Sequence, residues 1–173
     1  MISKACVAMS ILVCLSATDA LGKDVDPAKI AIANFDFVDT SGEITDEAVR
    51  HETQLREFET VLQETISQNQ KLDLVAMPCD AHRCSLARPG MDQLLRQARA
   101  ANARYLLAGG LHKMSTLIGW AKFIVFDLEK SGQVCDRLLT YRGDTAEAWQ
   151  RAAKFSAGDI IRYCFADIRG HSG

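Results

Sequence analysis

Hydrophobic and polar positions alternate in blocks along the chain, and each block predicts one element. Segment 29–39, KIAIANFDFVD, alternates and is rich in isoleucine, phenylalanine and valine, which is typical of a β-strand. From Asp46 to Gln68 the apolar residues recur at helical spacing, as Leu55, Phe58, Leu62 and Ile66. The pattern therefore predicts a strand followed by an amphipathic helix with a charged outer face.

The middle of the chain repeats this strand-and-helix order. Segment 71–78, KLDLVAMP, predicts a short strand that Pro78 ends, and segment 90–103 predicts a helix with an inner face of Leu94, Leu95, Ala98 and Ala101. Segment 104–117, RYLLAGGLHKMSTL, predicts a third strand, in which Gly109 and Gly110 indicate a bulge or a close approach of another backbone. This strand could lie at an exposed sheet edge, which would allow a homodimer.

The last third predicts a hairpin and a helix. Segments 119–129 and 133–143 are strands joined by the turn Lys-Ser-Gly. Asp144 is expected to cap the final helix, with Glu147 in the capping-box position and an apolar side of Ala148, Trp149, Ala152, Phe155 and Ile160. The fold class is thus α/β (α+β), one mixed sheet with the order β-α-β-α-β-β-β-α. The first strands should be parallel, through right-handed crossovers, and the last three antiparallel.

Composition and the first residues point to an exported protein. The chain has 173 residues, is 48% hydrophobic and has a formal net charge of -2, which suggests one domain with a real core and gives no reason to expect nucleic-acid binding. Residues 1–22 have Lys4, a short apolar run and then small residues, as secretory signal peptides do. We expect cleavage after Gly22, with Ala20 as the second choice and a lipoprotein signal at Cys14 as an alternative. The mature domain, 23–173, is then periplasmic, without a membrane span.

Four cysteines remain after the signal peptide, and an oxidising compartment favours disulfides between them. Eight strand residues from Cys135 to the turn span about 26 Å, and the following helix runs back about 30 Å to Cys164. These lengths nearly cancel, so we expect a Cys135–Cys164 disulfide, which leaves Cys79 to pair with Cys84.

The loop MPCDAHRCSLARPG, 77–90, has an alternative chemistry. Cys79, His82 and Cys84 could offer two thiolates and an imidazole to zinc or copper, or the two cysteines could act as a thiol redox pair. The spacing matches neither a strong metal signature nor C-x-x-C, and a structural disulfide is the favoured interpretation.

The position of this loop also predicts a binding surface. In an open parallel sheet, ligands sit beyond the carboxyl ends of the strands. Asp36 and Asp39 end the first strand, and His82 and Arg83 follow the second, so these four residues could form a polar cleft. The alternative is that Asp39 and the residues after it only make a turn and cap a helix.

Other residues carry weaker signals. We expect His51 to be solvated on its helix, His112 to lie at the surface, and Trp120 and Trp149 to belong to the core or a sheet face. The sequence contains no G-x-S-x-G, Walker or H-E-x-x-H motif, so we predict no catalytic residue and no cofactor.

The element order and three segments resemble a known group. Ile30 to Ser41, the strand ARYLLAGGL and the hairpin around FDLEKSG resemble short exported proteins of a domain-of-unknown-function family. That family is similar in turn to the amino-terminal domain of TolB and to the curli-secretion lipoprotein domain. The likeness covers most of residues 29–165, and the group has no catalytic set to transfer.

The resemblance implies a role in the cell envelope. It suggests a non-enzymatic accessory protein that binds a partner protein or a small ligand, with some members associated with periplasmic quinoprotein alcohol-oxidation systems. The alternative function is a metal-binding or thiol-redox protein that uses Cys79, His82 and Cys84.

Overall fold

A mixed β-sheet forms the centre of the computed structural model, which describes residues 26–44, 47–79 and 83–166. Its strands are β1 (Ala28–Ile32), β2 (Asp36–Asp39), β3 (Leu72–Leu74), β4 (Tyr105–Lys113), β5 (Ile118–Asp127) and β6 (Gly132–Arg142). The helices are α1 (Ala48–Ser67), α2 (Met91–Ala100) and α3 (Ala146–Cys164). The signal-peptide prediction falls outside the described residues. Within them, no helix is long and apolar enough to cross a membrane.

The strand order is β3-β1-β4-β5-β6, and β2 also pairs with β4. The pairs of β1 with β3 and β4, and of β2 with β4, are parallel, whereas β4, β5 and β6 form an antiparallel meander. The predicted mixed sheet is therefore confirmed, including both kinds of pairing. The expectation that the third strand lies at an edge is wrong, because β4 has neighbours on both sides.

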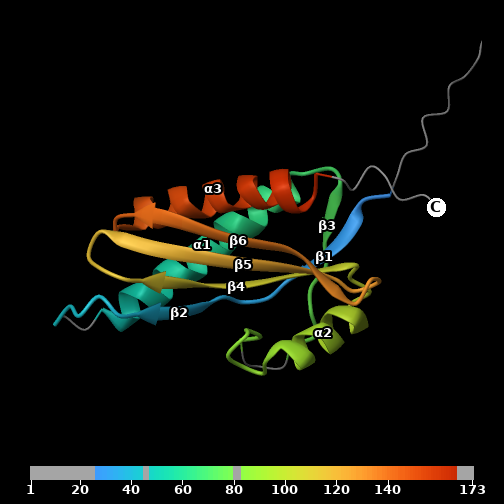
Figure 1. The fold of residues 1–173 in the computed structure, drawn as a ribbon, viewed down its shortest axis with the longest axis horizontal. Helices are drawn as coiled ribbons and strands as arrows, with labels where there is room; N and C mark the ends of the chain where they lie inside the picture. Colours follow the sequence, from blue (N-terminus) through green and yellow to red (C-terminus); the bar gives the residue numbers. More distant parts are fainter. Residues whose placement is uncertain (1–25, 45–46, 80–82, 167–173) are drawn as a thin grey trace, which may run out of the picture.

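Helices cover the two faces of the sheet unequally. Helices α1 and α3 lie on one face and α2 lies on the other (Figure 1). The larger core contains Phe58, Phe123 and Trp149 between the sheet and the helix pair, and a smaller core contains Leu94 and Leu106 under α2. Trp149 is thus a core residue, as predicted, whereas Phe155 of α3 is 63% exposed, contrary to expectation.

The first predicted strand is divided into β1 and β2. Ile32 pairs with Leu107 and Asp36 with Gly110, so the β1–β2 side has one residue more than β4 between these pairs. The extra residue moves the core-facing positions from Ile30 to Phe35, and side-chain alternation continues after the break. The break brings β2 beyond the end of β1, next to the start of α1.

Gly109 is required by a close approach rather than by a bulge. A β-carbon at this position would lie 2.3 Å from the carbonyl oxygen of Lys122 on β5, a distance that atoms do not reach without a backbone shift. The register of β4 with β5 continues through this residue without interruption. Of the two predictions for the glycine pair, the close approach is confirmed.

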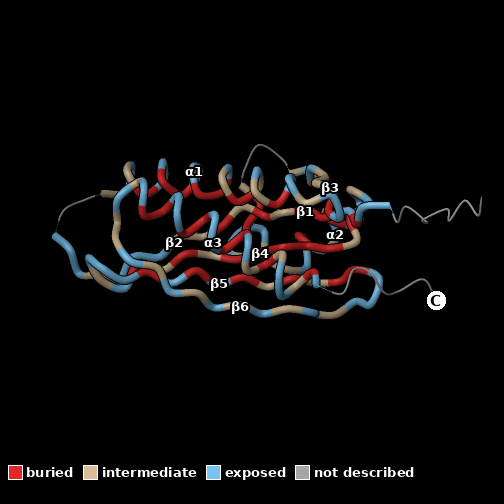
Figure 2. The backbone as a smooth tube through the Cα atoms, turned by 90° about the horizontal axis from the view of Figure 1, so that it is seen from above, coloured by how far each residue is buried: buried red, intermediate tan, exposed pale blue. Residues whose placement is uncertain are grey.

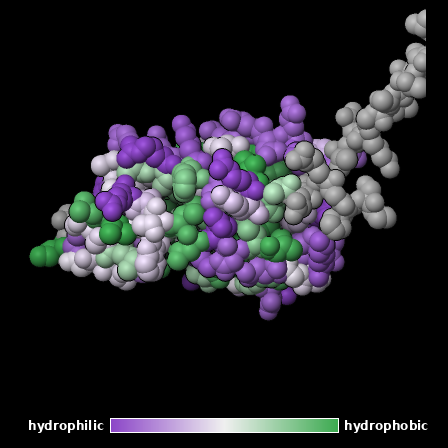
Figure 3. Space-filling model, turned by 45° about the horizontal axis from the view of Figure 1, so that its top comes forward, coloured by the Kyte–Doolittle hydropathy of each residue, from purple (hydrophilic) through white to green (hydrophobic). Residues whose placement is uncertain are grey.

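The end of the molecule after β2 carries exposed apolar side chains. Figure 3 shows hydrophobic surface at the end where the loop after β2 projects. Ile44 of this loop is fully exposed, and Val38 and Leu117 are also exposed.

Candidate functional site

An open groove of about 670 Å³ lies beside β2 and the start of α1. The sequence grouped Asp36, Asp39, His82 and Arg83, and the structure brings Asp36, Asp39 and Arg83 to this groove. His82 lies outside the described residues. The other lining residues are Phe35, Phe37, Gly42, Glu43, Glu47, Ala48, His51, Glu52 and Leu55.

Asp36 fixes the loop that precedes α2. Its carboxylate accepts a hydrogen bond of 2.5 Å from the Ser85 hydroxyl and one of 2.9 Å from the backbone N–H of Ala87. The first residue of β2 therefore holds the loop against the sheet, and its two oxygens already have donors inside the protein.

Arg83 lines the groove and is held there by an ion pair with Glu59, a buried residue of α1. The guanidinium of Arg83 donates to the Glu59 carboxylate and, at 3.1 Å, to the carbonyl oxygen of Phe35. Glu59 also accepts from the backbone N–H of Phe35 at 2.7 Å and from the side-chain amide of Asn34 at 3.2 Å. These bonds satisfy the backbone at the break between β1 and β2, where the ladder cannot do so.

Lys113, the last residue of β4, lies in the interior beside the groove. Its side chain is 3% exposed, and its ammonium group donates to Glu43 and lies 2.8 Å from Asp144, 3.6 Å from Glu47 and 3.7 Å from Asp39. Burial lowers the pKa of Lys113, but the hydrogen bonds to Asp144 and Glu43 outweigh burial and hold the pKa above its ordinary value. The lysine is therefore charged and compensated by four carboxylates.

Asp144 is the second centre of this network. Its carboxylate lies 2.7 Å from Arg50 and accepts a 3.0 Å hydrogen bond from the indole N–H of Trp149. Burial raises the pKa of Asp144, but hydrogen bonds with His51, Lys113 and Arg50 outweigh it and hold the pKa far below its usual range.

The prediction that Asp144 caps α3 is wrong. The residue before α3 is Thr145, whose hydroxyl accepts from the backbone N–H of Ala148. Asp144 stands one residue earlier and points to the charged network instead, because Lys113 and Arg50 converge there.

His51 is buried, contrary to the prediction of a solvated helical residue. Its Nε2 lies 3.0 Å from Asp144, its Nδ1 lies 3.9 Å from Asp39, and its ring stacks on Trp149 with centroids 6.0 Å apart. Helix α1 is rotated so that this histidine faces the turn before α3. The prediction failed because the neighbours of His51 in sequence are polar, while its partners are distant in sequence.

Asp39 connects the network to the groove. Burial raises the pKa of Asp39, but hydrogen bonds from Ser41 and the charges of Lys113 and His51 outweigh it and lower the pKa below its ordinary value. The bond from the Ser41 backbone N–H, at 2.8 Å, also makes the turn that the sequence offered as the alternative for this segment. Asp39 therefore closes the turn with Ser41 and also belongs to the charged network around Lys113.

One group of three side chains in the described part of the chain has ligand atoms close enough for a metal ion. These residues are Glu47, His51 and Asp144, and their ligand atoms lie within 4.8 Å of one another. Lys113 and Arg50 already place positive charge against Asp144 in the same space. A metal ion would have to compete with both cations, so we interpret the group as part of a charge-balanced network.

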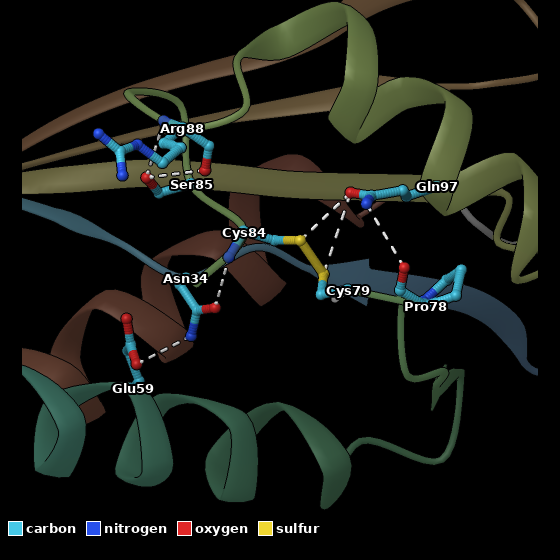
Figure 4. The surroundings of a disulfide bond; sticks show 8 residues. All are labelled: Asn34, Glu59, Pro78, Cys79, Cys84, Ser85, Arg88 and Gln97. Carbon is cyan, nitrogen blue, oxygen red and sulfur yellow. Dashed lines mark hydrogen bonds between the residues drawn. A yellow bond between two sulfur atoms is a disulfide. The ribbon is translucent and has the colours of Figure 1, made fainter. Parts of the chain in front are cut away.

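Cys79 and Cys84 form a disulfide beside the groove wall (Figure 4). The backbone of Cys84 exchanges two hydrogen bonds with Asn34, and Oε1 of Gln97 lies 3.2 Å from the Cys84 sulfur. In this form the two sulfurs are bonded to each other and offer no thiolate to a metal. The second disulfide, Cys135–Cys164, joins β6 to the end of α3.

A family model matches residues 28–161 of the chain. Its family is DUF3280, with the description "Protein of unknown function (DUF2380)". The chain belongs to the DUF3280 family. The match spans every strand and the first two helices. It confirms the resemblance of this DUF3280 protein to a domain-of-unknown-function family. No curated protein matches its sequence.

Three solved structures show that the DUF3280 fold occurs in proteins of low sequence identity. The hypothetical protein CT253 from Chlamydia trachomatis is 12% identical over 81% of this chain and 99% of its own, with a TM-score of 0.55. The PelC dodecamer from Paraburkholderia phytofirmans is 16% identical over 79% of this chain and 86% of its own, with a TM-score of 0.51. TolB from Acinetobacter baumannii is 14% identical over 81% of this chain and 29% of its own, with a TM-score of 0.50. The TolB-like fold is therefore confirmed.

Proposed function

We propose that this DUF3280 protein is an exported periplasmic accessory protein without catalytic activity, which binds a partner protein or a small ligand in the groove beside β2. The lining supports this proposal. It combines the carboxylates of Asp36, Asp39, Glu43, Glu47 and Glu52 with a single arginine and with the apolar Phe35, Phe37 and Leu55. Counted with Asp144 and Glu59, seven carboxylates stand against the four cations Lys113, Arg50, Arg56 and Arg83, so a negative excess remains. A groove with this excess and these rings attracts a ligand that has a positively charged group next to an apolar part.

The pairing of the charged residues favours binding over catalysis. Glu59 is engaged by Arg83, Lys113 is engaged by Asp144, and Asp36 holds two donors of its own chain. Groups that are fixed in this way shape a surface but are poor acids, bases or nucleophiles, because reaction would require them to leave their partners. The exposed Ile44 and Val38 near the same end of the molecule suit contact with a protein.

The setting we propose comes from the family resemblance. Proteins of a periplasmic quinoprotein alcohol-oxidation system are the first partners to test. For the metal-binding or thiol-redox alternative, which needs Cys79, His82 and Cys84, the described contacts provide no supporting observation, and counting the thiols of the exported protein tests it directly.

The test uses two lysine substitutions on the same helix. Glu52→Lys reverses a charge in the groove, whereas Glu57→Lys makes the same change on an exposed part of α1 that does not line it. Each protein is exported, cross-linked in the periplasm and analysed by mass spectrometry, and native mass spectrometry detects a retained small ligand. We expect wild type and Glu57→Lys to carry the same bound molecule and Glu52→Lys to lose it. Equal recovery with Glu52→Lys would contradict the proposal.

A further inference from the structure

Strand β6 forms a long unpaired edge of the sheet. It runs for 11 residues and pairs with β5 on one side. On its other side, no residue of the described ranges forms a hydrogen bond with its backbone. Figure 2 shows β6 along the border, with no described element outside it. An edge strand of this length without proline presents alternate N–H and C=O groups for pairing, and natural proteins usually cover or shorten such edges.

The side chains of β6 leave this edge accessible. Those that face α3 are already engaged, since Arg137 pairs with Asp159 and Cys135 is bonded to Cys164. The opposite set, Asp136, Leu138, Thr140 and Arg142, is exposed, and within it Asp136 forms an exposed ion pair with Lys122 of β5. Another strand could therefore add to the edge without disturbing the contacts of β6 with α3.

The charges of β6 are arranged symmetrically about Leu139. Asp136 lies three residues before Leu139 and Arg142 three residues after it, on the same exposed face. When such a strand pairs antiparallel with itself about Leu139, every aspartate faces an arginine. Opposite charges that face each other across strands stabilise a pair, and like charges destabilise it.

We propose that two copies of this chain pair through β6 in antiparallel register, with Leu139 opposite Leu139 of the partner subunit. Asp136 then faces Arg142 of the partner subunit, and two-fold symmetry makes this pair twice. Leu138 faces Thr140 of the partner subunit on the same side. The two sheets become one continuous sheet, in which residues 136–142 of each β6 are paired and residues 132–135 extend beyond the partner strand.

Neighbouring registers lack this complementarity. Pairing about Arg137 sets two arginines opposite each other, and pairing about Asp136 sets two aspartates opposite each other. Pairing about Leu138 puts an apolar pair at the centre but moves Asp136 opposite Thr140, so the charges meet only diagonally. This interface is independent of the groove beside β2, and either proposal can fail without the other.

Sedimentation velocity of the exported protein over a range of concentrations tests the dimer. Arg142→Asp places two aspartates opposite each other and should raise the dimer Kd by about tenfold or more. The exchange Asp136→Arg/Arg142→Asp restores opposite charges across the interface and should recover part of the affinity, because it also removes the ion pair of Asp136 with Lys122. Arg151→Asp makes the same charge change on the exposed face of α3 and is the control. A wild-type protein that stays monomeric, or a double exchange that is no better than Arg142→Asp, overturns the proposal.

Cysteine cross-linking tests the register separately. Directly opposed residues of antiparallel strands have Cα atoms about 4.5–5.5 Å apart, which a disulfide can join. Leu139→Cys should therefore give a covalent dimer under mild oxidation, while Leu138→Cys, which lies diagonal to its own copy, should not. Covalent dimer from Leu138→Cys alone overturns the proposed register, and circular dichroism verifies that both variants fold.

Discussion

The ammonium group of Lys113 lies 2.8 Å from the carboxylate of Asp144, so that the end of β4 is tied to the turn before α3. Arg50 and His51 of α1 converge on the same carboxylate. Asp144 therefore links the sheet to α1 and α3, the two helices that share one face of it, at the end of the molecule that holds the groove. The network sets the positions of Asp39 and Glu47 on the groove wall.

Replacement of Lys113 by methionine should strongly destabilise the fold. The substitution keeps most of the side-chain volume but leaves Asp39, Glu43, Glu47 and Asp144 without the cation between them. Loss of one partner from a buried ion pair costs about 3–5 kcal/mol, because the remaining charge stays desolvated. Urea unfolding measures the change in the free energy of unfolding.

The control is Lys122→Met, which removes a lysine of β5 whose side chain is 50% exposed and paired with Asp136. An exposed pair of this kind contributes about 1 kcal/mol or less. Equal losses for the two variants would show that Lys113 does not depend on its interior position.

The stability of the protein should fall in acid, in part through Asp144. The pKa of this carboxyl is lowered in the folded state, below the ordinary value of 3.8. A lowered pKa stabilises the fold at pH values above the unfolded pKa, and this contribution is lost as the pH falls toward the folded pKa. The loss therefore begins near pH 4 and grows below it.

Asp144→Asn removes this contribution, and its free energy of unfolding should change less steeply than that of wild type below about pH 4. Asp92→Asn, which removes an exposed carboxylate of α2, is the control for the change of charge. Chemical denaturation between pH 3 and pH 7 gives the slopes. A variant slope equal to that of wild type would mean that Asp144 does not couple folding to protonation.

Glu59 should stabilise the break between β1 and β2. Glu59→Ala removes the acceptor for the Phe35 N–H, the Asn34 amide and the Arg83 guanidinium at once. Each buried donor left without a partner costs about 1–3 kcal/mol, so the variant should lose about 2 kcal/mol or more. Glu57→Ala, an exposed change on the same helix, should cost about 0.5 kcal/mol or less. Similar stabilities for the two variants would rule out this role for Glu59.

Two features of this site are visible in the pattern of apolar and polar residues. Lys113 lies two residues after Leu111 and four after Gly109, which puts it on the core-facing side of β4, where a lysine needs carboxylates. The break in the first strand is visible too, because the apolar positions move from Ile30 and Ile32 to Phe35 and Phe37. Both features interrupt the alternation of apolar and polar residues that is expected along a half-buried strand.

The partners of these residues were beyond sequence reasoning. His51 meets Asp144, and Arg83 meets Glu59, because of the rotation of α1 about its axis and the path of the loop before α2. Local patterns do not specify either quantity. The rim of Asp36, Asp39 and Arg83 could be predicted because it follows from the general rule that the carboxyl ends of parallel strands meet at one edge.

The two disulfides should differ in their contribution to stability. Cys135–Cys164 closes a loop with a sequence separation of 29, and Cys79–Cys84 one with a separation of 5. In the chain-entropy model the longer loop contributes about 3.5 kcal/mol and the shorter about 2 kcal/mol, because more conformations of the unfolded chain are removed. Removal of each pair by double serine substitution, followed by urea unfolding, measures the two contributions. The wild-type exported protein should show no free thiol on titration under denaturing conditions. A Cys79→Ser/Cys84→Ser variant less stable than Cys135→Ser/Cys164→Ser would mean that the contacts of the short loop with Asn34 and Gln97, rather than chain entropy, dominate its contribution.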